Sequence, residues 1–428
     1  MKFSCTRKTI LSTAVSIGLL STSTFTSAAG FQLAEYSATG LGRAYAGEAA
    51  MADNASAQWR NPAMLTYLAG TQISVGAIYV DPNIDVNGQI NGALNTQSDD
   101  FANSAVIPNF YFSHQLNEQF FMGVALGTNY GMETKLDDNF AGNHFGNEAM
   151  VKTMEANLNL AYQLNEAISF GGGLRYVMGE GHFGATSPAQ SEPTLPKGTT
   201  LKYMEGDDKA WGWQLGTAWQ INEAHRIGFA YKSEVDLKLS GYAEGLGFGL
   251  PAGTRDNGYM NLALPATAEL ASHHQLNEKL AIHASINWTD WSSFEKLEAH
   301  LENYGTHMVK VENWEDNYRF ALGATYQLNQ KIALRSGIAY DMSAVSDKNR
   351  TITIPETDRT WLSVGASYEV SSQLSVDGGF TYILAKDADI KESRGYESDD
   401  TAQAIGGAFT GTTSGSVWLI GVQANYTF

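Results

Sequence analysis

Few side chains in this chain are arranged for catalysis or for metal binding. The single cysteine, Cys5, lies close to the start, and neither a Gly-x-Ser-x-Gly nor a His-Glu-x-x-His motif occurs. Those motifs would expose a serine nucleophile on a tight turn, or place two zinc ligands on one helix face. His273 and His274 are adjacent, and neighbouring residues of a strand face opposite sides, so they cannot readily share one metal ion. The pattern argues against an enzyme.

Glycines and paired acids do not predict a cofactor site either. Gly245, Gly247 and Gly249 form a glycine-rich stretch, but a nucleotide-binding loop requires a buried strand before it and a helix after it. Neither pattern flanks these residues. The Asp-Asp pairs of the chain fall in or beside predicted loops, where solvated charge is more common than a metal site. We therefore expect no cofactor and no metal ion.

The charge of the chain excludes one class of partner, and its first residues predict export. The 428 residues include 27 lysines and arginines against 45 aspartates and glutamates, a formal charge of −18. A nucleic-acid-binding protein would need a basic face. Residues 1–28 combine early basic residues, a short apolar stretch and Thr26-Ser27-Ala28, the arrangement of a cleaved signal peptide rather than a membrane anchor. Cleavage after Ala28 would also remove Cys5.

The remaining chain has no stretch near the roughly 18 consecutive apolar residues of a membrane-spanning helix. Alternation with period two is common instead. In the last residues, Trp418, Ile420 and Val422 fall on one face, while Gly421 and Gln423 fall on the other. A soluble β-sandwich could show this alternation, but its repetition to the C-terminus, with polar residues opposite a continuous apolar face, favours lipid-facing strands. Such strands must close into a barrel, because an open edge cannot persist in hydrocarbon.

A short repeated motif predicts the number of strands. An apolar residue followed by Asn or Ser recurs at residues 116, 164, 221, 276, 328 and 370, and these residues are typical of tight turns. The spacing leaves room for two strands of about ten residues and one longer loop. Six turns divide residues 71–428 into seven hairpins, which predicts an all-β, 14-stranded antiparallel transmembrane barrel. Its first strand is expected at 71–81, its third at 119–130 and its last at 415–428.

The stretch between the signal peptide and the first strand shows no such alternation. Residues 29–70 are rich in small side chains, which is compatible with one or two short helices. They hold too few large apolar residues for a core of their own. Since a fourteen-stranded ring is wider than its own side chains can fill, we predict that residues 29–70 form a helical hatch that plugs the lumen of the barrel, residues 71–428.

Stretches of the hatch and barrel together resemble a known family. They are Ala29-Gly30-Phe31-Gln32-Leu33, Gly40-Leu41-Gly42-Arg43-Ala44-Tyr45, Arg60-Asn61-Pro62-Ala63, Asn129-Tyr130-Gly131 and Ile352-Thr353-Ile354-Pro355. In combination they are similar to the FadL family, whose members are outer-membrane transporters of long-chain fatty acids and other hydrophobic molecules. The resemblance implies a fourteen-stranded barrel closed by the hatch, which agrees with the count of turns.

The resemblance also implies a surface where ligand is first captured. Family members present a hydrophobic groove in the third and fourth extracellular loops, here residues 183–208 and 241–258. The second of these loops carries Leu246, Phe248 and Leu250 at alternate positions. They could form an ordinary loop apex with one apolar cluster, although exposed apolar clusters usually mark contact sites.

From the groove, ligand in this family passes to a pocket against the hatch. Phe31 matches the hatch aromatic beside that pocket, and Lys310 aligns with a lysine that lines it. A fatty-acid carboxylate in a dry pocket needs such a cation, because an unpaired buried charge is costly. Glu180 and His182 stand where a basic residue is expected in fatty-acid transporters. This departure bears on the headgroup and therefore on the substrate.

Opening of the pocket in this family involves the hatch. Asn61, Pro62 and Ala63 match the segment whose shift opens it. Arg335 and Asp341 point into the lumen by the alternation of their strand, and Asp341 resembles a carboxylate of the family's lumen network. A structural role that holds the hatch to the wall is the simpler interpretation of both.

The exit from the barrel is expected at the third strand. In the family this strand is kinked and leaves a lateral opening in the wall. Gly127, Asn129, Tyr130 and Gly131 are the expected kink here, because glycine and asparagine relieve strain at bulges. The same residues could instead simply begin the loop 131–149.

We therefore expect a monomeric outer-membrane protein that takes up long-chain fatty acids passively, with capture by loops, a hatch gate and lateral exit. Its expected partners are a hydrophobic small molecule and outer-membrane lipid. A channel of the same fold for aromatic hydrocarbons is the alternative substrate. A general diffusion porin is the alternative class, but porins lack an N-terminal plug.

Overall fold

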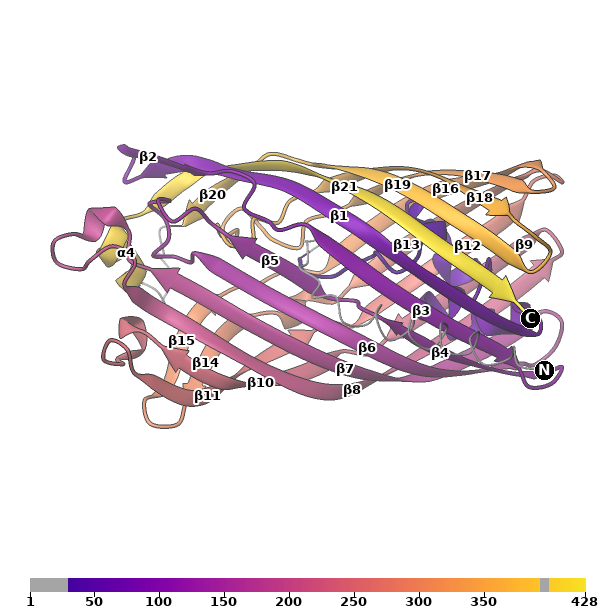
Figure 1. Ribbon diagram of the computed structural model, residues 1–428, viewed down its shortest axis with the longest axis horizontal. Coiled ribbons are helices and arrows are strands. Elements are labelled where there is room, and N and C mark those ends of the chain that lie inside the picture. Colours follow the sequence, from indigo (N-terminus) through magenta and orange to yellow (C-terminus); the bar gives the residue numbers. More distant parts are fainter. Residues whose placement is uncertain (1–29, 393–399) are drawn as a thin grey trace, which may run out of the picture.

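The computed structural model describes residues 30–392 and 400–428, so the predicted signal peptide lies outside the described residues. Antiparallel strands form one closed sheet (Figure 1). The first strand, β1 (Thr71–Ile90), pairs with β3 (Ala105–Gln115) on one side and with the last strand, β21 (Phe409–Thr427), on the other. This last pairing closes the sheet, as hydrocarbon requires. The predicted 14-stranded barrel is confirmed.

Six of the fourteen strands consist of two successive segments. In chain order the wall is made of β1, β3, β4 (Phe120–Gly127) with β5 (Gly131–Lys135), β6 (Glu148–Gln163), β7 (Ile168–Thr186), β8 (Thr200–Asn222), β9 (His225–Lys232) with β10 (Val235–Glu244), β11 (Arg255–Leu264) with β12 (Thr267–Gln275), β13 (Leu280–Thr289) with β14 (Lys296–Leu301), β15 (Gly305–Val311) with β16 (Asn317–Asn329), β17 (Ile332–Asp341), β18 (Arg359–Glu369), β19 (Leu374–Ala385) with β20 (Ala388–Glu392), and β21. A further short strand, β2 (Leu94–Ser98), pairs with the end of β1.

The connections at one end of the barrel carry short helical turns. They are η3 (Ala189–Ser191), η4 (Leu246–Phe248) and α4 (Asp400–Gly406), whereas η5 (Trp291–Ser293) lies between the two segments β13 and β14 of one strand. Within the part of the chain that the structure describes, no helix is long and apolar enough to cross a bilayer.

Alternation along the strands separates an apolar outer face from a polar or small inner face. On β21, Val422 is 60% exposed whereas the next residue, Gln423, is 2% exposed. On β18, Val364 is 57% exposed and Ser363 is buried. An apolar side chain that faces outward at every second position has no favourable contact in water. The exposed face therefore identifies the surface that contacts lipid.

The six repeated turns all lie at the end of the barrel where the C-terminus lies (Figure 1). In each turn the Asn or Ser side chain accepts a hydrogen bond from a backbone amide two residues ahead, as Asn117 does from Gln119 N at 2.9 Å and Ser371 from Gln373 N at 3.3 Å. This side-chain turn explains why the motif recurs, because Asn and Ser can replace a missing backbone partner.

The hatch lies inside the barrel, toward the end with the short turns (Figure 1). Its described part contains four short helices: α2 (Ala38–Leu41), η1 (Glu48–Ala50), α3 (Ala57–Arg60) and η2 (Pro62–Tyr67). They contact the wall on several sides, with α2 against β18 and β19, η1 against β9 and β12, and η2 against β6 and β7. The residues of these helices are almost all buried.

Close contact between hatch and wall depends on wall glycines. A Cβ atom on Gly228 of β9 would lie 1.9 Å from the carbonyl oxygen of Ala49, and one on Gly171 of β7 would lie 2.3 Å from the amide nitrogen of Ala63. Both distances are far below any permitted contact, so a side chain at either position would displace the hatch. Small residues on both surfaces thus explain the composition of residues 29–70.

Deletion of residues 30–60 should convert a plugged barrel into an open one. We expect the intact chain to pass few ions in planar bilayers and the deletion variant to pass many, because a ring of this width holds water once its lumen is empty. Large and equal conductances of the two proteins would contradict the plug and favour a diffusion porin.

Candidate functional site

An apolar cavity lies between the hatch and the end of the barrel that carries the long loops. Its lining comes from β5, β6, β7, β10, β11, β14, β15 and two inward loops, and its apolar part includes Met132, Val151, Phe183, Leu239, Met260, Leu262, Phe294, Leu297 and Ile354. The cavity encloses about 40 Å³, whereas small-molecule sites usually offer roughly 300 Å³ or more. The site is therefore closed in this conformation, and a ligand can enter only if side chains move.

Phe31 supplies the hatch side of this cavity. Its ring is 1% exposed and makes edge contacts with Trp291 at 4.7 Å and Phe294 at 5.6 Å between centroids. Tyr130 and Trp314 complete the aromatic cluster at 6.0 and 6.1 Å. Tilted and edge-to-face rings stabilise such clusters beyond their buried area. Because Phe31 belongs to the hatch, movement of the hatch would enlarge the cavity.

Lys310 on β15 also lines the cavity and is 1% exposed. Its ammonium donates to Thr353 Oγ1 at 3.0 Å and lies 3.4 Å from Glu392 Oε1 and 5.6 Å from the ring centroid of Phe183. A buried ammonium needs such partners, because its desolvation is otherwise uncompensated. The structure thus brings Phe31 and Lys310 into one cavity, as the resemblance implied.

The loop residues Leu246, Phe248 and Leu250 do not form the exposed cluster that their spacing suggests. Leu246 is 41% exposed, but Phe248 and Leu250 are buried in the apolar cluster that surrounds the cavity. Residues 246–248 form the helical turn η4 rather than a strand, so alternate residues do not share a face. Phe248 packs against His307 instead. The loop therefore runs from the exposed Leu246 into the buried apolar cluster that also contains residues of the cavity lining.

The third strand of the barrel is interrupted between Gly127 and Gly131. Three residues, including Asn129 and Tyr130, separate β4 from β5, while only two residues separate their partners Glu155 and Lys152 on β6. One extra residue on one strand is a bulge, which bends the strand. On the other side, β3 pairs with β4 only over residues 110–115, and the described pairings join residues 105–109 of β3 to no residue of β5.

The hatch takes over the backbone hydrogen bonds at this interruption. Leu33 N donates to Asn129 O at 2.6 Å, Gly131 N donates to Phe31 O at 2.8 Å, and Gln32 and Tyr130 form an antiparallel bridge. Residues 31–33 therefore act as a short substitute strand. Buried backbone groups need a partner, so the bend of the wall and the position of Phe31 depend on each other.

Asn61, Pro62 and Ala63 connect two parts of the hatch to the wall. Asn61 Nδ2 donates to Ala49 O at 2.6 Å and to Thr217 O of β8 at 3.0 Å, while Asn61 Oδ1 accepts from Ala63 N at 2.9 Å. Asn61 is thus the N-cap of η2, with Pro62 at the first helical position, as both residue types prefer. A shift of these residues would break a hatch contact and a wall contact together.

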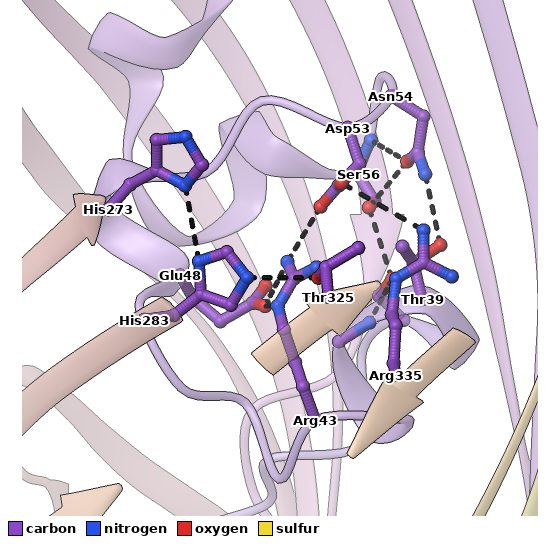
Figure 2. Close-up of polar contacts among 12 residues, drawn as sticks. Thr39, Arg43, Glu48, Asp53, Asn54, Ser56, His273, His283, Thr325 and Arg335 are labelled. Carbon is purple, nitrogen blue, oxygen red and sulfur yellow. Dashed lines mark hydrogen bonds and ion pairs between the residues drawn. The ribbon is translucent and has the colours of Figure 1, made fainter. Parts of the chain in front are cut away.

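Arg335 joins the hatch to the barrel wall. Its guanidinium lies 3.9 Å from Asp53 of the hatch and 3.4 Å from Asp377 of β19, and it donates to Ser367. Asp53 also pairs with Arg43 at 2.7 Å. Figure 2 shows Arg43 and Asp53 of the hatch beside Arg335 of the wall. Arg335 therefore holds the hatch in place through an electrostatic network.

A second set of contacts extends this network around the hatch. Arg43 donates to Glu48 at 2.7 Å, and Thr39 Oγ1 donates to Asp377 Oδ2 at 2.6 Å. Asp341 lies apart from them. It accepts from Asn317 at 3.2 Å and lines a separate cavity beside Arg319 and Arg60. Parity alone correctly put Arg335 and Asp341 in the lumen, but only the structure separates their surroundings.

Glu180 and His182 do not stand in place of a lysine or arginine at the site. The Glu180 carboxylate is 52% exposed and lies 3.5 Å from Lys152 Nζ. The imidazole of His182 stacks on Tyr203 at 6.0 Å, although His182 also contributes to the cavity lining. Lys310 is the only lysine or arginine among the described residues that line the cavity.

The adjacent histidines have different partners, as expected for neighbours on a strand. His273 Nδ1 lies 3.2 Å from His283 Nδ1, and His274 Nδ1 lies 3.0 Å from His225 Nδ1. Figure 2 shows the first pair beside Arg43 and Glu48. Across residues 30–392 and 400–428, no three His, Cys, Asp or Glu side chains are grouped to hold a metal ion.

Burial and neighbouring arginines shift the pKa values of two carboxyl groups of the hatch. Loss of hydration alone would raise the pKa of the Asp53 carboxyl, but Arg43 and Arg335 hold it below its ordinary value. Burial raises the pKa of the Glu35 carboxyl to about 7, although backbone amides at Glu35 and Ala34 oppose the shift. Asp53 is therefore ionised at neutral pH and contributes a permanent hatch-to-wall attraction.

Sequence reasoning missed Glu392, Asp377 and the pairing of Arg43 with Glu48 and Asp53. A charged triplet in a segment otherwise rich in alanine and glycine was a usable signal for the last of these. Glu392 carried no comparable signal, because it lies at the end of the short strand β20, far from Lys310 in the chain.

Comparison with known proteins identifies the family of this chain. A family model described as outer membrane protein transport protein (OMPP1/FadL/TodX) matches residues 19–428. The chain belongs to the FadL family. It is 34% identical over 450 residues to the long-chain fatty acid transport protein of Escherichia coli O157:H7, with 97% of each chain covered. The barrel is thus an outer-membrane protein of a transport family.

Solved structures agree on the fold. A FadL homologue of Pseudomonas aeruginosa superimposes with a TM-score of 0.84 at 22% identity, covering 94% of this chain and 100% of that chain. The Pseudomonas putida toluene transporter TodX superimposes with a TM-score of 0.68 at 17% identity, with 94% and 100% covered. Both therefore support the architecture rather than a particular ligand.

The substitution Arg335→Gln should loosen the hatch. We expect a cysteine placed at the buried position Met64, in a chain with Cys5→Ser, to react with a thiol reagent about tenfold faster, because removing one partner of a buried ion pair is strongly destabilising. Lys386→Gln removes an exposed cation from the same side of the barrel and is the matched control. Equal reaction rates in the Arg335 and Lys386 variants would contradict the anchoring role.

Proposed function

We propose that the chain takes up long-chain fatty acids passively across the outer membrane. The observation that carries this proposal is the apolar cavity with one buried ammonium, Lys310, at its edge. An extended acyl chain matches the apolar lining, and a carboxylate matches the ammonium, because charge-assisted hydrogen bonds are the strong ones in a dry site. The relative from Escherichia coli O157:H7 is named for transport of the same class of molecule.

The proposed route begins at the loop around η4. Leu246 is exposed while Phe248 and Leu250 are buried in the apolar cluster that includes the cavity lining, so the loop offers apolar contacts from the surface inward. Ligand that displaces Phe31 would disturb residues 31–33 and their hydrogen bonds to Asn129 and Gly131. Binding would thereby loosen the hatch and the bent third strand together. We propose lateral exit at this strand, driven by the concentration gradient of the ligand.

Aromatic hydrocarbons are the second candidate substrate. The toluene transporter TodX shares the fold, and the cluster around Phe31 offers aromatic rings. A hydrocarbon has no headgroup, however, and would leave the buried Lys310 without a function in recognition. An ammonium in the lining of the cavity offers a charge-assisted hydrogen bond to a carboxylate only, which favours an anionic ligand.

Lys310→Met should separate the two substrates. We expect this variant to bind oleate about tenfold more weakly while its affinity for methyl oleate is unchanged, since only the free acid carries a charge that pairs with Lys310. Titration of the detergent-solubilised chain, followed by tryptophan fluorescence, measures both. Lys331→Met, at an exposed turn, is the control. Binding of toluene but not oleate by the wild-type chain would support the alternative substrate.

Deletion of Thr128 should block exit without blocking binding. The deletion removes the extra residue of the bulge, so β4 and β5 can pair with β6 as one continuous strand. We expect oleate affinity to remain within about twofold of wild type, while uptake of labelled oleate by cells falls severely. Undiminished uptake by a correctly folded deletion variant would argue against the lateral route.

A further inference from the structure

Glu392 is buried at the end of β20, where its carboxylate bridges two elements of the site. Its Oε1 atom lies 3.4 Å from Lys310 Nζ, and its Oε2 atom accepts a hydrogen bond from Ile352 N at 2.9 Å. Both Glu392 and Lys310 are 1% exposed. The charge of Lys310 is therefore already compensated inside the protein in the absence of ligand.

We propose that Glu392 is an internal competitor of the ligand carboxylate for Lys310. This inference rests on the proposed function, since it assumes that the ligand is a fatty acid. In the closed site Glu392 pairs with Lys310, and in the loaded site the carboxylate of the ligand replaces it. Glu392 then sets both the affinity for the acid and the preference for the acid over a neutral analogue.

The geometry of the pair suits exchange rather than permanent pairing. Charge-assisted N–H···O bonds are usually about 2.7–2.9 Å long, whereas Lys310 and Glu392 are 3.4 Å apart. The shorter contact of Lys310 is with the neutral hydroxyl of Thr353 at 3.0 Å. An ammonium has three donors, so it can keep Thr353 while it changes its anionic partner.

Glu392 also has a partner that ligand binding need not remove. The amide of Ile352 donates to Oε2, the oxygen that does not contact Lys310. The carboxylate therefore retains one hydrogen bond after it loses the ammonium. Two residues along the same loop, Ile354 lines the cavity. A change of the anionic partner of Lys310 would thus also affect the loop of residues 352–354, through the hydrogen bond between Glu392 and Ile352.

The charge balance of the site explains why competition matters. Glu312 lines the same cavity and is fully buried, with its Oε2 atom accepting from Trp314 Nε1 at 3.0 Å. Lys310 is the single lysine or arginine in that lining, as far as the structure describes it. A ligand carboxylate therefore enters beside two carboxylates and one ammonium, and neutralising Glu392 should favour it.

The test is a double-mutant cycle with the full chain in detergent, using oleate and methyl oleate as probes. We expect Glu392→Gln to bind oleate about tenfold more tightly and methyl oleate as wild type does. Because the gain depends on Lys310, it should vanish when Glu392→Gln is made in the Lys310→Met background. Asp389→Asn removes a carboxylate from an exposed position of the same strand and should change neither affinity.

Several results would overturn the inference. An unchanged or lower oleate affinity of Glu392→Gln would show that Glu392 only supports the structure. A gain that persists without Lys310 would reflect general repulsion rather than competition. If neither wild type nor Glu392→Gln binds oleate, the proposed function fails as well, whereas equal binding by both refutes the competitor alone. Glu392→Ala gives the same comparison if the glutamine variant does not fold, as judged by its migration on unheated gels.

Discussion

The structure depends on one constraint, that backbone hydrogen-bonding groups cannot be left unpaired in a bilayer. It requires β1 and β21 to pair along their length and so closes the ring. It also makes any break in a strand costly. The third strand nevertheless breaks between Gly127 and Gly131, and residues 31–33 of the hatch supply the missing partners. This break in the wall is thus stabilised by the part of the chain that plugs it.

The hydrogen bonds between residues 31–33 and the third strand connect the cavity, the hatch and the bent strand. Phe31 belongs to the substitute strand and also forms one side of the apolar cavity. A ligand that moves its ring necessarily acts on the hydrogen bonds to Asn129 and Gly131. Cavity, hatch and bent strand are therefore coupled through adjacent residues, without a long path between separate sites. In the proposed route, the binding energy of the ligand would act on the hatch and the bent strand through these contacts.

Buried charged side chains in the lumen are paired in the same way as the buried backbone groups. Arg43, Asp53 and Arg335 hold the hatch to the wall, and Lys310 and Glu392 hold a loop above the cavity. Buried ion pairs contribute little net stability but are costly to break on one side only. They are therefore suited to contacts that must be specific when closed and able to exchange partners when a charged ligand arrives.

The sequence by itself determined the barrel, because the two patterns that predict it, strand alternation and the repeated turns, are both local. Period-two alternation follows from strand geometry, and the Asn or Ser of each turn bonds to amides two residues ahead, as at Asn117. Family resemblance placed Phe31 and Lys310 near one another, and the structure joins them in one cavity. The tertiary structure alone decided the partners of Lys310, the burial of Phe248 and Leu250, and the different surroundings of Arg335 and Asp341. Each of these depends on contacts between residues that are distant in the chain and that form only when the ring has closed around the hatch. No local sequence pattern predicts such long-range contacts.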